Sequence, residues 1–223
     1  ADFSDLEGFA FGTFRIRHGA RAFTLVELLV VIAIVGLLAA LIIAGLPKAH
    51  EAAGIAKSSS QMRQIASAAL LWANDNRGCL PTPTTPFWYQ VLYPYIYNTN
   101  APSPFFGLDN MGKNLRGTVL YCPLKDQARE VEAGTPIRSY GWNMLLKDNN
   151  DQPLPMARIE QSSKTMMLAT TVKNSGVGPS KNQWNFSTRA GGRTLVIFID
   201  GHLERLAIED IPTSDSDPFW KPE

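Results

Sequence analysis

Apolar residues dominate one long stretch near the amino end of the chain. Between Leu28 and Leu46 there are 19 consecutive residues without a charge. As a helix rising about 1.5 Å per residue they would span roughly 28 Å, close to the thickness of a membrane's hydrocarbon core. Glu27 is the only charged residue from Phe23 to Leu46. A charge inside a spanning helix costs roughly 2.5–3.5 kcal/mol, so it needs a partner. We therefore expect residues 23–46 to be a transmembrane half-helix in which Glu27 has a specific role.

The helical pattern continues beyond this stretch and becomes amphipathic. Small and apolar residues recur three and four positions apart, which predicts a helix over residues 47–78. Gly78 fits the left-handed cap that ends many helices. Pro47 predicts a bend, because proline removes a helical hydrogen bond. A coiled coil is an alternative, but the narrow stripe of small residues favours packing against a sheet of the same chain. The stripe consists of Ala52, Ile55, Ala56, Met62, Ile65, Ala66, Ala69, Leu70 and Ala73.

Residues 79–118 are rich in proline and aromatic residues. Proline is excluded from central strands, and many aromatic rings are costly to leave in water. This segment is therefore expected to consist of loops or short helices that fold back on the sheet, with its rings in the core. A sugar-binding aromatic surface is the functional alternative. The residues concerned are Pro81, Pro83, Pro86, Phe87, Trp88, Tyr89, Tyr93, Pro94, Tyr95, Tyr97, Pro102, Pro104, Phe105 and Phe106.

Runs of β-branched and apolar residues bounded by Gly, Pro and Asn predict the strands. Asp200-Gly201 lies between the last two runs and is the signal for a two-residue type I′ hairpin. Residues 79–223 are expected to form one globular domain. A helix followed by an antiparallel meander predicts an α+β fold, with the long helix packed on a carboxy-terminal antiparallel sheet. The predicted strands are 118–122, 139–145, 165–172, 194–199 and 202–208.

Charge and cysteine content narrow the range of functions. With 21 Lys and Arg against 20 Asp and Glu, the formal net charge is +1. No basic cluster with interleaved aromatics follows the helix, so nucleic-acid binding is not expected. Cys79 and Cys122 are the only cysteines. In an exported domain they could form one disulfide, and the sequence leaves that pairing open.

The residues at the start of the apolar stretch resemble a known signal. A basic leader ends in the small residue Ala22, and Phe23-Thr24-Leu25-Val26-Glu27 follows. This pattern resembles the type III signal of type IV prepilins and type II secretion pseudopilins, although Gly is usual at the position of Ala22. The resemblance implies a pilin-like fold, a leader over residues 1–22, cleavage by prepilin peptidase between Ala22 and Phe23, and N-methylation of Phe23. It also implies an inner-membrane, single-pass protein whose globular domain lies in the periplasm or on an extracellular filament.

Physical reasoning assigns Glu27 a role consistent with that signal. Cleavage before Phe23 would leave an ammonium group in the apolar layer, four residues from Glu27. Two buried charges of opposite sign are tolerated only when they meet. The ammonium of one copy meeting Glu27 of another would set the register of assembly. The alternative is a signal anchor in which Glu27 is tolerated near the headgroups.

A second resemblance covers the carboxy-terminal part of the chain. Residues 191–204, GGRTLVIFIDGHLE, look like the closing motif of pilin-like proteins abundant in planctomycete and verrucomicrobial bacteria. Further similarity lies at residues 61–65, 74–81, 122–123 and 139–143. The family motif carries a His nine residues before the Asp-Gly pair, and that position is Ala190 here. Any role tied to that His is therefore absent or moved.

The sequence offers few residues in arrangements suited to catalysis. His202 is the only His expected in the globular domain, and a Cys122–His202 dyad would lack a nucleophile motif and an orienting group. No zinc spacing or phosphate-binding loop occurs, so no catalytic residue and no cofactor is predicted. Asp148, Asn150 and Asp151 are weak calcium candidates, as are Asp215 and Asp217, because hard cations prefer oxygen ligands. These residues are also common turn formers.

Two classes of function follow. The first is a structural subunit of a type IV pilus-like or type II secretion pseudopilus filament. Its expected partners are other copies or related pilins, prepilin peptidase, the inner membrane and the assembly machinery. The alternative is a membrane-anchored, exported module that binds a ligand or surface and does not polymerise. Cleavage and methylation at Phe23 would separate the two.

Overall fold

The computed structural model describes residues 23–84, 86–99, 118–124, 139–172, 176–179 and 186–221. The chain divides into two compact units, Ala1–Leu46 and Pro47–Glu223. The helix α1, Leu25–Asp75, has 51 residues and continues through Pro47 without a break in its secondary structure. The bend near Pro47 stays a prediction.

The end of α1 differs in detail from the predicted cap. The helix stops at Asp75, and the turn that closes it contains two left-handed residues, Arg77 at φ 56° and Gly78 at φ 74°. The Gly78 N–H donates to the Ala73 carbonyl over 2.8 Å, which is the closing bond of a Schellman motif. Arg77, not Gly78, is therefore the first residue beyond the helix in the left-handed region.

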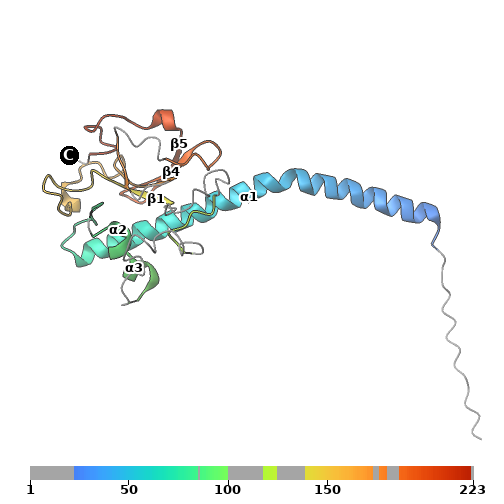
Figure 1. Ribbon diagram of the computed structural model, residues 1–223, viewed down its shortest axis with the longest axis horizontal. Coiled ribbons are helices and arrows are strands. Elements are labelled where there is room, and N and C mark those ends of the chain that lie inside the picture. Colours follow the sequence, from blue (N-terminus) through green and yellow to red (C-terminus); the bar gives the residue numbers. More distant parts are fainter. Residues whose placement is uncertain are drawn as a thin grey trace, which may run out of the picture. The chain divides into compact units, whose positions relative to one another are not determined.

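The second half of α1 packs against a sheet of its own chain, as predicted. Its buried side chains recur three and four positions apart, which places them on one face of the helix. Figure 1 shows this half of α1 running along the sheet. The buried positions are Ser58, Gln61, Met62, Ile65, Ala66, Ala68, Ala69 and Ala73.

The sheet has five strands in the order β3-β1-β2-β4-β5. Four predicted strands are confirmed, each shorter than expected. The strands are β1 Tyr140–Asn143, β2 Met166–Thr170, β3 Gly176–Val177, β4 Thr194–Phe198 and β5 Leu203–Leu206.

The expectation of a purely antiparallel sheet is wrong at one edge. β1–β2, β2–β4 and β4–β5 are antiparallel, but β3 pairs in parallel with β1, with Trp142 opposite Gly176. Because β1 and β4 already occupy both sides of β2, the chain leaving β2 joins the free edge of β1. The resulting strand, β3, runs antiparallel to β2. It is therefore parallel to β1, because β1 and β2 are themselves antiparallel.

The predicted strand over 118–122 is also wrong. Residues 118–124 form turns and bends, with the Tyr121 N–H bonded to the Thr118 carbonyl at 3.2 Å. Side chains satisfy this backbone in place of a neighbouring strand, since Gln61 Nε2 donates to Thr118 O at 3.1 Å and Val119 N donates to the Tyr97 hydroxyl at 3.1 Å. Leu120, Cys122 and Leu124 are buried in the core cluster that includes α1.

The β4–β5 hairpin exists, but its turn is not the predicted type I′. Only Gly201, at φ 88°, has positive φ there, and a type I′ turn needs two such residues. The Gly201 N–H donates to the Phe198 carbonyl, and the Phe198 N–H donates to the His202 carbonyl, both over 3.0 Å. This pattern is a three-residue loop in which the left-handed glycine forms a bulge.

The aromatic segment forms two short helices, α2 Trp88–Val91 and α3 Tyr93–Tyr97. Trp88 and Trp142 stack with ring centroids 5.7 Å apart, and both are almost fully buried. The core interpretation is therefore confirmed for Trp88 and Tyr89. Figure 1 places α3 on the other side of α1 from β4 and β5. Pro102, Pro104, Phe105 and Phe106 lie outside the described residues.

The second face of the sheet is covered by residues 211–221. Phe219 and Trp220 pack with Met166, Val196 and Phe198 in a second core cluster. Asn143 Nδ2 fastens this segment by donating to the carbonyls of Met166 at 2.9 Å and Trp220 at 2.8 Å. Two short 3-10 helices, η1 Met156–Arg158 and η3 Ile208–Asp210, complete the described elements.

Candidate processing and assembly site

The predicted assembly residue, Glu27, lies in the first turn of α1. Glu27 Oε2 accepts hydrogen bonds from the backbone N–H and the hydroxyl of Thr24, both over 2.9 Å. In return, the Glu27 N–H donates to Thr24 Oγ1 at 3.2 Å. This reciprocal pattern is a capping box, which satisfies donors that the start of a helix leaves unpaired. Glu27 thus has a local partner within its own chain.

Thr24 was missed as a contributor to this site. Thr-x-x-Glu before an apolar run is a readable capping signal. From the sequence, Glu27 was expected either to meet a partner in another copy or to be tolerated near the headgroups, and not to bond within its own first turn. Both Thr24 bonds go to Oε2, so within the described residues Oε1 has no hydrogen-bond partner. That oxygen is open to a second donor.

The apolar half of α1 is exposed along its length. Phe23 and Leu25 are 76% and 79% exposed, and the large apolar side chains from Val26 to Leu46 are 47% to 68% exposed. Among the described residues, α1 is the one helix that is long and apolar enough to cross a membrane. None of the residues in its most apolar stretch is buried. Ala22 and the rest of the predicted leader lie outside the described residues.

The structure does not bring Cys79 and Cys122 together, and both are free thiols. Cys79 follows the carboxy-terminal end of α1, where its Sγ lies 3.9 Å from the Arg77 carbonyl. Cys122 Sγ lies 3.1 Å from Ser58 Oγ. Ser58 is 17 residues before the end of the helix, roughly 26 Å along its axis.

Cys122 instead belongs to a buried polar network between α1 and the sheet, which the sequence did not reveal. The Tyr140 hydroxyl donates to Gln61 Oε1 at 2.9 Å. Burial raises the pKa of Tyr140 well above its usual value, and the neighbouring Cys122 adds to the shift. Tyr140 therefore remains a neutral donor. The network fixes where the helix sits along the sheet.

The calcium candidates at residues 147–152 form a self-contained turn. Asp148 Oδ1 accepts the backbone N–H of Asn150 at 2.8 Å and that of Gln152 at 2.7 Å. Lys147 pairs with Asp151. Within the described residues no group of three or more His, Cys, Asp or Glu side chains could hold a metal ion. In the second candidate, Asp217 Oδ1 accepts the Phe219 N–H at 2.9 Å.

His202 lies on the hairpin and not beside Cys122. Its ring stacks on Phe198 with centroids 4.3 Å apart, its Nδ1 is 2.6 Å from Asp200 Oδ1, and its Nε2 is 3.5 Å from Glu204 Oε1. Partial burial opposes ionisation of Asp200, but the bonds from His202 hold the pKa of that carboxyl below its usual value. His202 thus braces the turn.

Ala190 occupies a closed site. It is 1% exposed, and its carbonyl accepts a hydrogen bond from Arg205 Nη2 at 2.6 Å.

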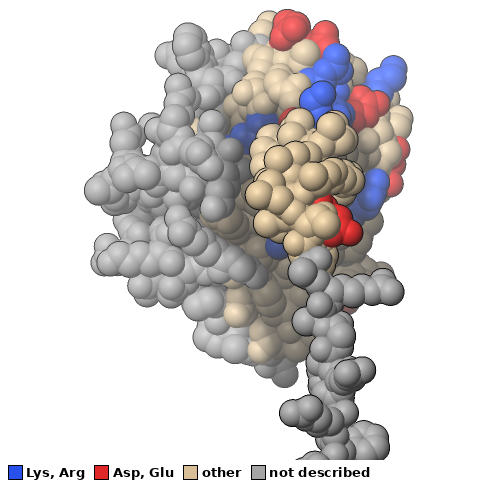
Figure 2. Space-filling view, turned by 90° about the vertical axis from the view of Figure 1, so that its right-hand side faces the viewer, with Lys and Arg blue, Asp and Glu red and all other residues tan. Residues whose placement is uncertain are grey.

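Figure 2 shows Lys, Arg, Asp and Glu side chains interspersed over the described part of one face of the domain. This mixture gives that face no extended surface of one sign among the residues described.

The fold and the first turn of α1 define a class of protein. A long apolar helix begins with a capped acidic turn, and its second half packs on a small mixed sheet, an arrangement consistent with an α+β pilin-like fold. Residues 17–43 match the family model of the prokaryotic N-terminal methylation motif. The chain therefore carries a prepilin signal of the type IV pilin and pseudopilin kind. No curated protein and no solved structure matches the chain.

Proposed function

We propose that the chain is a structural subunit of a type IV pilus-like or type II secretion pseudopilus filament. Prepilin peptidase cleaves it between Ala22 and Phe23, and Phe23 is then N-methylated. The apolar half of α1 anchors the subunit in the inner membrane before assembly, with the globular domain on the outer side. The observation that carries this proposal is the methylation motif over residues 17–43.

Glu27 gives this proposal its physical mechanism. Cleavage turns the Phe23 amide into an ammonium group, which is costly in an apolar layer unless a carboxylate meets it. Thr24 already orients Oε2 of Glu27, while Oε1 stays open within the described residues. A neighbouring copy can place its Phe23 ammonium on Oε1 without breaking the capping box. Glu27 then sets the axial register between neighbouring subunits.

The alternative function is a membrane-anchored binding module that does not polymerise. The same helix would then only hold the domain at the cell surface. The deciding experiment is the intact mass and amino-terminal sequence of the protein produced with and without a prepilin peptidase. A filament subunit begins at methylated Phe23 and is recovered in sheared, high-mass material. A protein that stays uncleaved and monodisperse supports the alternative.

Glu27 variants test the assembly mechanism separately from processing. Glu27→Ala removes the carboxylate and is expected to reduce sheared filaments by at least about tenfold, since an unpaired charge in the apolar layer costs roughly 2.5–3.5 kcal/mol. Thr24→Val is the matched control, because it removes the cap hydroxyl and keeps the carboxylate. Filament yield from Glu27→Ala equal to wild type would exclude the proposed role of Glu27.

A further inference from the structure

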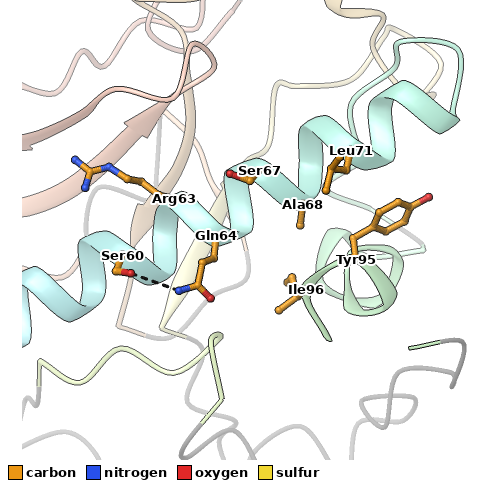
Figure 3. Close-up of a pocket in the computed structure, with 8 residues that line it drawn as sticks. All are labelled: Ser60, Arg63, Gln64, Ser67, Ala68, Leu71, Tyr95 and Ile96. Atoms are coloured by element: carbon orange, nitrogen blue, oxygen red, sulfur yellow. Dashed lines mark hydrogen bonds between the residues drawn. The ribbon is translucent and has the colours of Figure 1, made fainter. Parts of the chain in front are cut away.

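A groove lies on the outer side of α1, between this helix and α3. It encloses about 370 Å³, and Ser60, Arg63, Gln64, Ser67, Leu71 and Ile96 are among its lining residues. Figure 3 shows Arg63 extending away from Ile96 and Tyr95, at one end of the groove. Leu71 is 57% exposed. The groove therefore combines an open apolar side chain, uncharged polar groups and one cation.

A second hollow, of about 470 Å³, lies between the β4–β5 hairpin and residues 210–219. The rings of Phe198 and Phe219 line it, with centroids 5.8 Å apart in an edge arrangement. Three carboxylates, of Glu204, Asp210 and Asp217, and one ammonium, of Lys164, also line it. Both rings are largely buried, at 5% and 7% exposure, so the accessible surface of the hollow is marked mainly by its excess of acidic groups.

The groove and the hollow lie on opposite faces of the domain. At 100° per residue, Ser60, Ser67 and Leu71 point away from the α1 side chains that face the sheet, such as Met62 and Ile65. The hollow contacts the second core cluster, which covers the sheet face that α1 does not. A contact that joins groove to hollow must therefore be heterologous, and such contacts continue from copy to copy.

We propose that the hollow of one copy receives Arg63 from the groove of the next copy, which forms a head-to-tail contact between globular domains. This inference rests on the proposed filament function. Arg63 and Asp210 each have no ion pair within the described residues. The planar guanidinium suits the carboxylates that the hollow supplies, since it binds them through paired N–H groups.

The remaining lining groups fit the same contact. Ser60, Gln64 and Ser67 offer hydrogen bonds at the rim, and Leu71 offers apolar area to the wall of the hollow. The Lys164 ammonium in the hollow repels the incoming Arg63 guanidinium. The three carboxylates outnumber this one ammonium, so the net charge of the hollow still favours Arg63. The Asp217 carboxylate already caps the Phe219 N–H, and Glu204 Oε1 lies 3.5 Å from His202 Nε2. Asp210 is therefore the carboxylate of the hollow that is left for the guanidinium.

Reciprocal charge reversal tests this contact in the full chain, expressed with its peptidase and assembly machinery. Arg63→Glu and Asp210→Lys are each expected to reduce sheared filaments at least about tenfold, because like charges facing each other across an interface cost several kcal/mol. The double variant restores the pair. Co-expression of the two single variants also restores it, because alternating copies then present a complementary pair at every contact.

Two controls carry the same charge changes outside the groove and the hollow. Lys57→Glu alters an exposed cation of α1, and Glu160→Lys alters an exposed carboxylate. Both are expected to assemble as wild type does. Thermal unfolding of each variant in detergent shows whether its domain is folded.

The possible results separate this inference from the proposed function. If wild type is cleaved but gives no filaments, the filament function itself is rejected. If wild type assembles and the single variants do as well, only the Arg63 contact is rejected. It is equally rejected if folded single variants fail and neither the double variant nor co-expression restores filaments. The inference is supported if filaments are restored both in the double variant and on co-expression of the two single variants.

Discussion

Gly78 adopts a backbone conformation that other residues avoid, at the turn that closes α1. Its φ is 74°, and a Cβ added there would meet nothing within 4 Å. The cost of a side chain is therefore conformational only. Gly78→Ala is expected to lower the free energy of unfolding by about 1–2 kcal/mol, the cost of a left-handed residue with a Cβ.

Gly78→Asn is the matched control for that substitution. Asn tolerates the left-handed region better than Ala, so it should cost less. Thermal unfolding of the detergent-solubilised chain, followed by circular dichroism, measures both variants. Equal losses for Ala and Asn would contradict a purely conformational explanation.

Residue types alone predicted some of these positions but not others. Gly78 was expected in the cap because glycine is the usual left-handed residue after a helix. Arg77 was not, since nothing in a charged residue signals positive φ. Asp200-Gly201 predicted a hairpin correctly, but the turn type depends on the register of β4 and β5, which two residues do not determine.

At the scale of elements, Gly54 lets the segment 118–124 approach α1 closely. A Cβ at Gly54 would lie 2.7 Å from Leu124 Cδ2. Gly54→Ala gains about 1 kcal/mol of helix propensity but loses about 1–3 kcal/mol to overpacking. The expected net result is a loss of about 1 kcal/mol in the free energy of unfolding.

Truncating the neighbour reverses the sign of that effect. In a Leu124→Ala background the clash is gone, so Gly54→Ala is expected to stabilise the domain by about 1 kcal/mol. A double-mutant cycle by thermal unfolding isolates this coupling. Additive effects of the two substitutions would show that the contact carries no energy.

Asn143 joins the sheet to the carboxy-terminal segment. It is fully buried; its Nδ2 donates to the Met166 and Trp220 carbonyls, and its Oδ1 accepts the Leu145 N–H at 2.9 Å. Asn143→Ala leaves the buried Met166 and Trp220 carbonyls unpaired at about 1–3 kcal/mol each, so a loss of about 2–6 kcal/mol is expected. Asn143→Asp keeps the shape but, when ionised, cannot donate.

The Asn143→Asp variant should therefore depend on pH. Burial against two carbonyls raises the pKa of the introduced carboxyl in the folded state above its unfolded value near 3.9. The folded state then binds the proton more tightly, so the deficit relative to wild type is largest at neutral pH. It should shrink as pH falls through the folded pKa. Urea unfolding at pH 7 and pH 5 measures this difference, and a constant deficit would contradict it.

Elements with strong local signals were predictable, and those decided by pairing were not. The three-and-four spacing of apolar residues identified α1, and β-branched runs identified β1, β2, β4 and β5. Residues 118–122 look equally β-branched, but Gln61 and the Tyr97 hydroxyl bond their backbone where a strand partner would. The two-residue β3 has too few residues to show any pattern.

At the scale of the whole molecule, some residues of the candidate site could be predicted from the sequence and others could not. Glu27 was identifiable because a single charge in an apolar stretch is conspicuous in sequence. The Ser58–Gln61–Cys122–Tyr140 network was not, because bonded members such as Gln61 and Tyr140 lie 79 positions apart and each is unremarkable alone. The Cys79–Cys122 pairing was left open for the same reason. Proximity between distant residues is a property of the fold and not of spacing.

In the proposed filament function, processing determines whether the whole chain can assemble. Before cleavage, Phe23 has an amide and no ammonium, so Glu27 of a neighbour has no cation to meet.

Ala22→Gly introduces the residue usual at this position and is expected to raise the rate of cleavage severalfold, because Gly offers the peptidase an unhindered backbone. Pulse-chase labelling with the peptidase present measures the rate, and sheared fractions taken at the same times measure filaments. Filaments should contain only cleaved chains and should appear earlier with Ala22→Gly. Uncleaved chains recovered in filaments would show that the Phe23 ammonium is dispensable, and the pairing with Glu27 would then have to be abandoned.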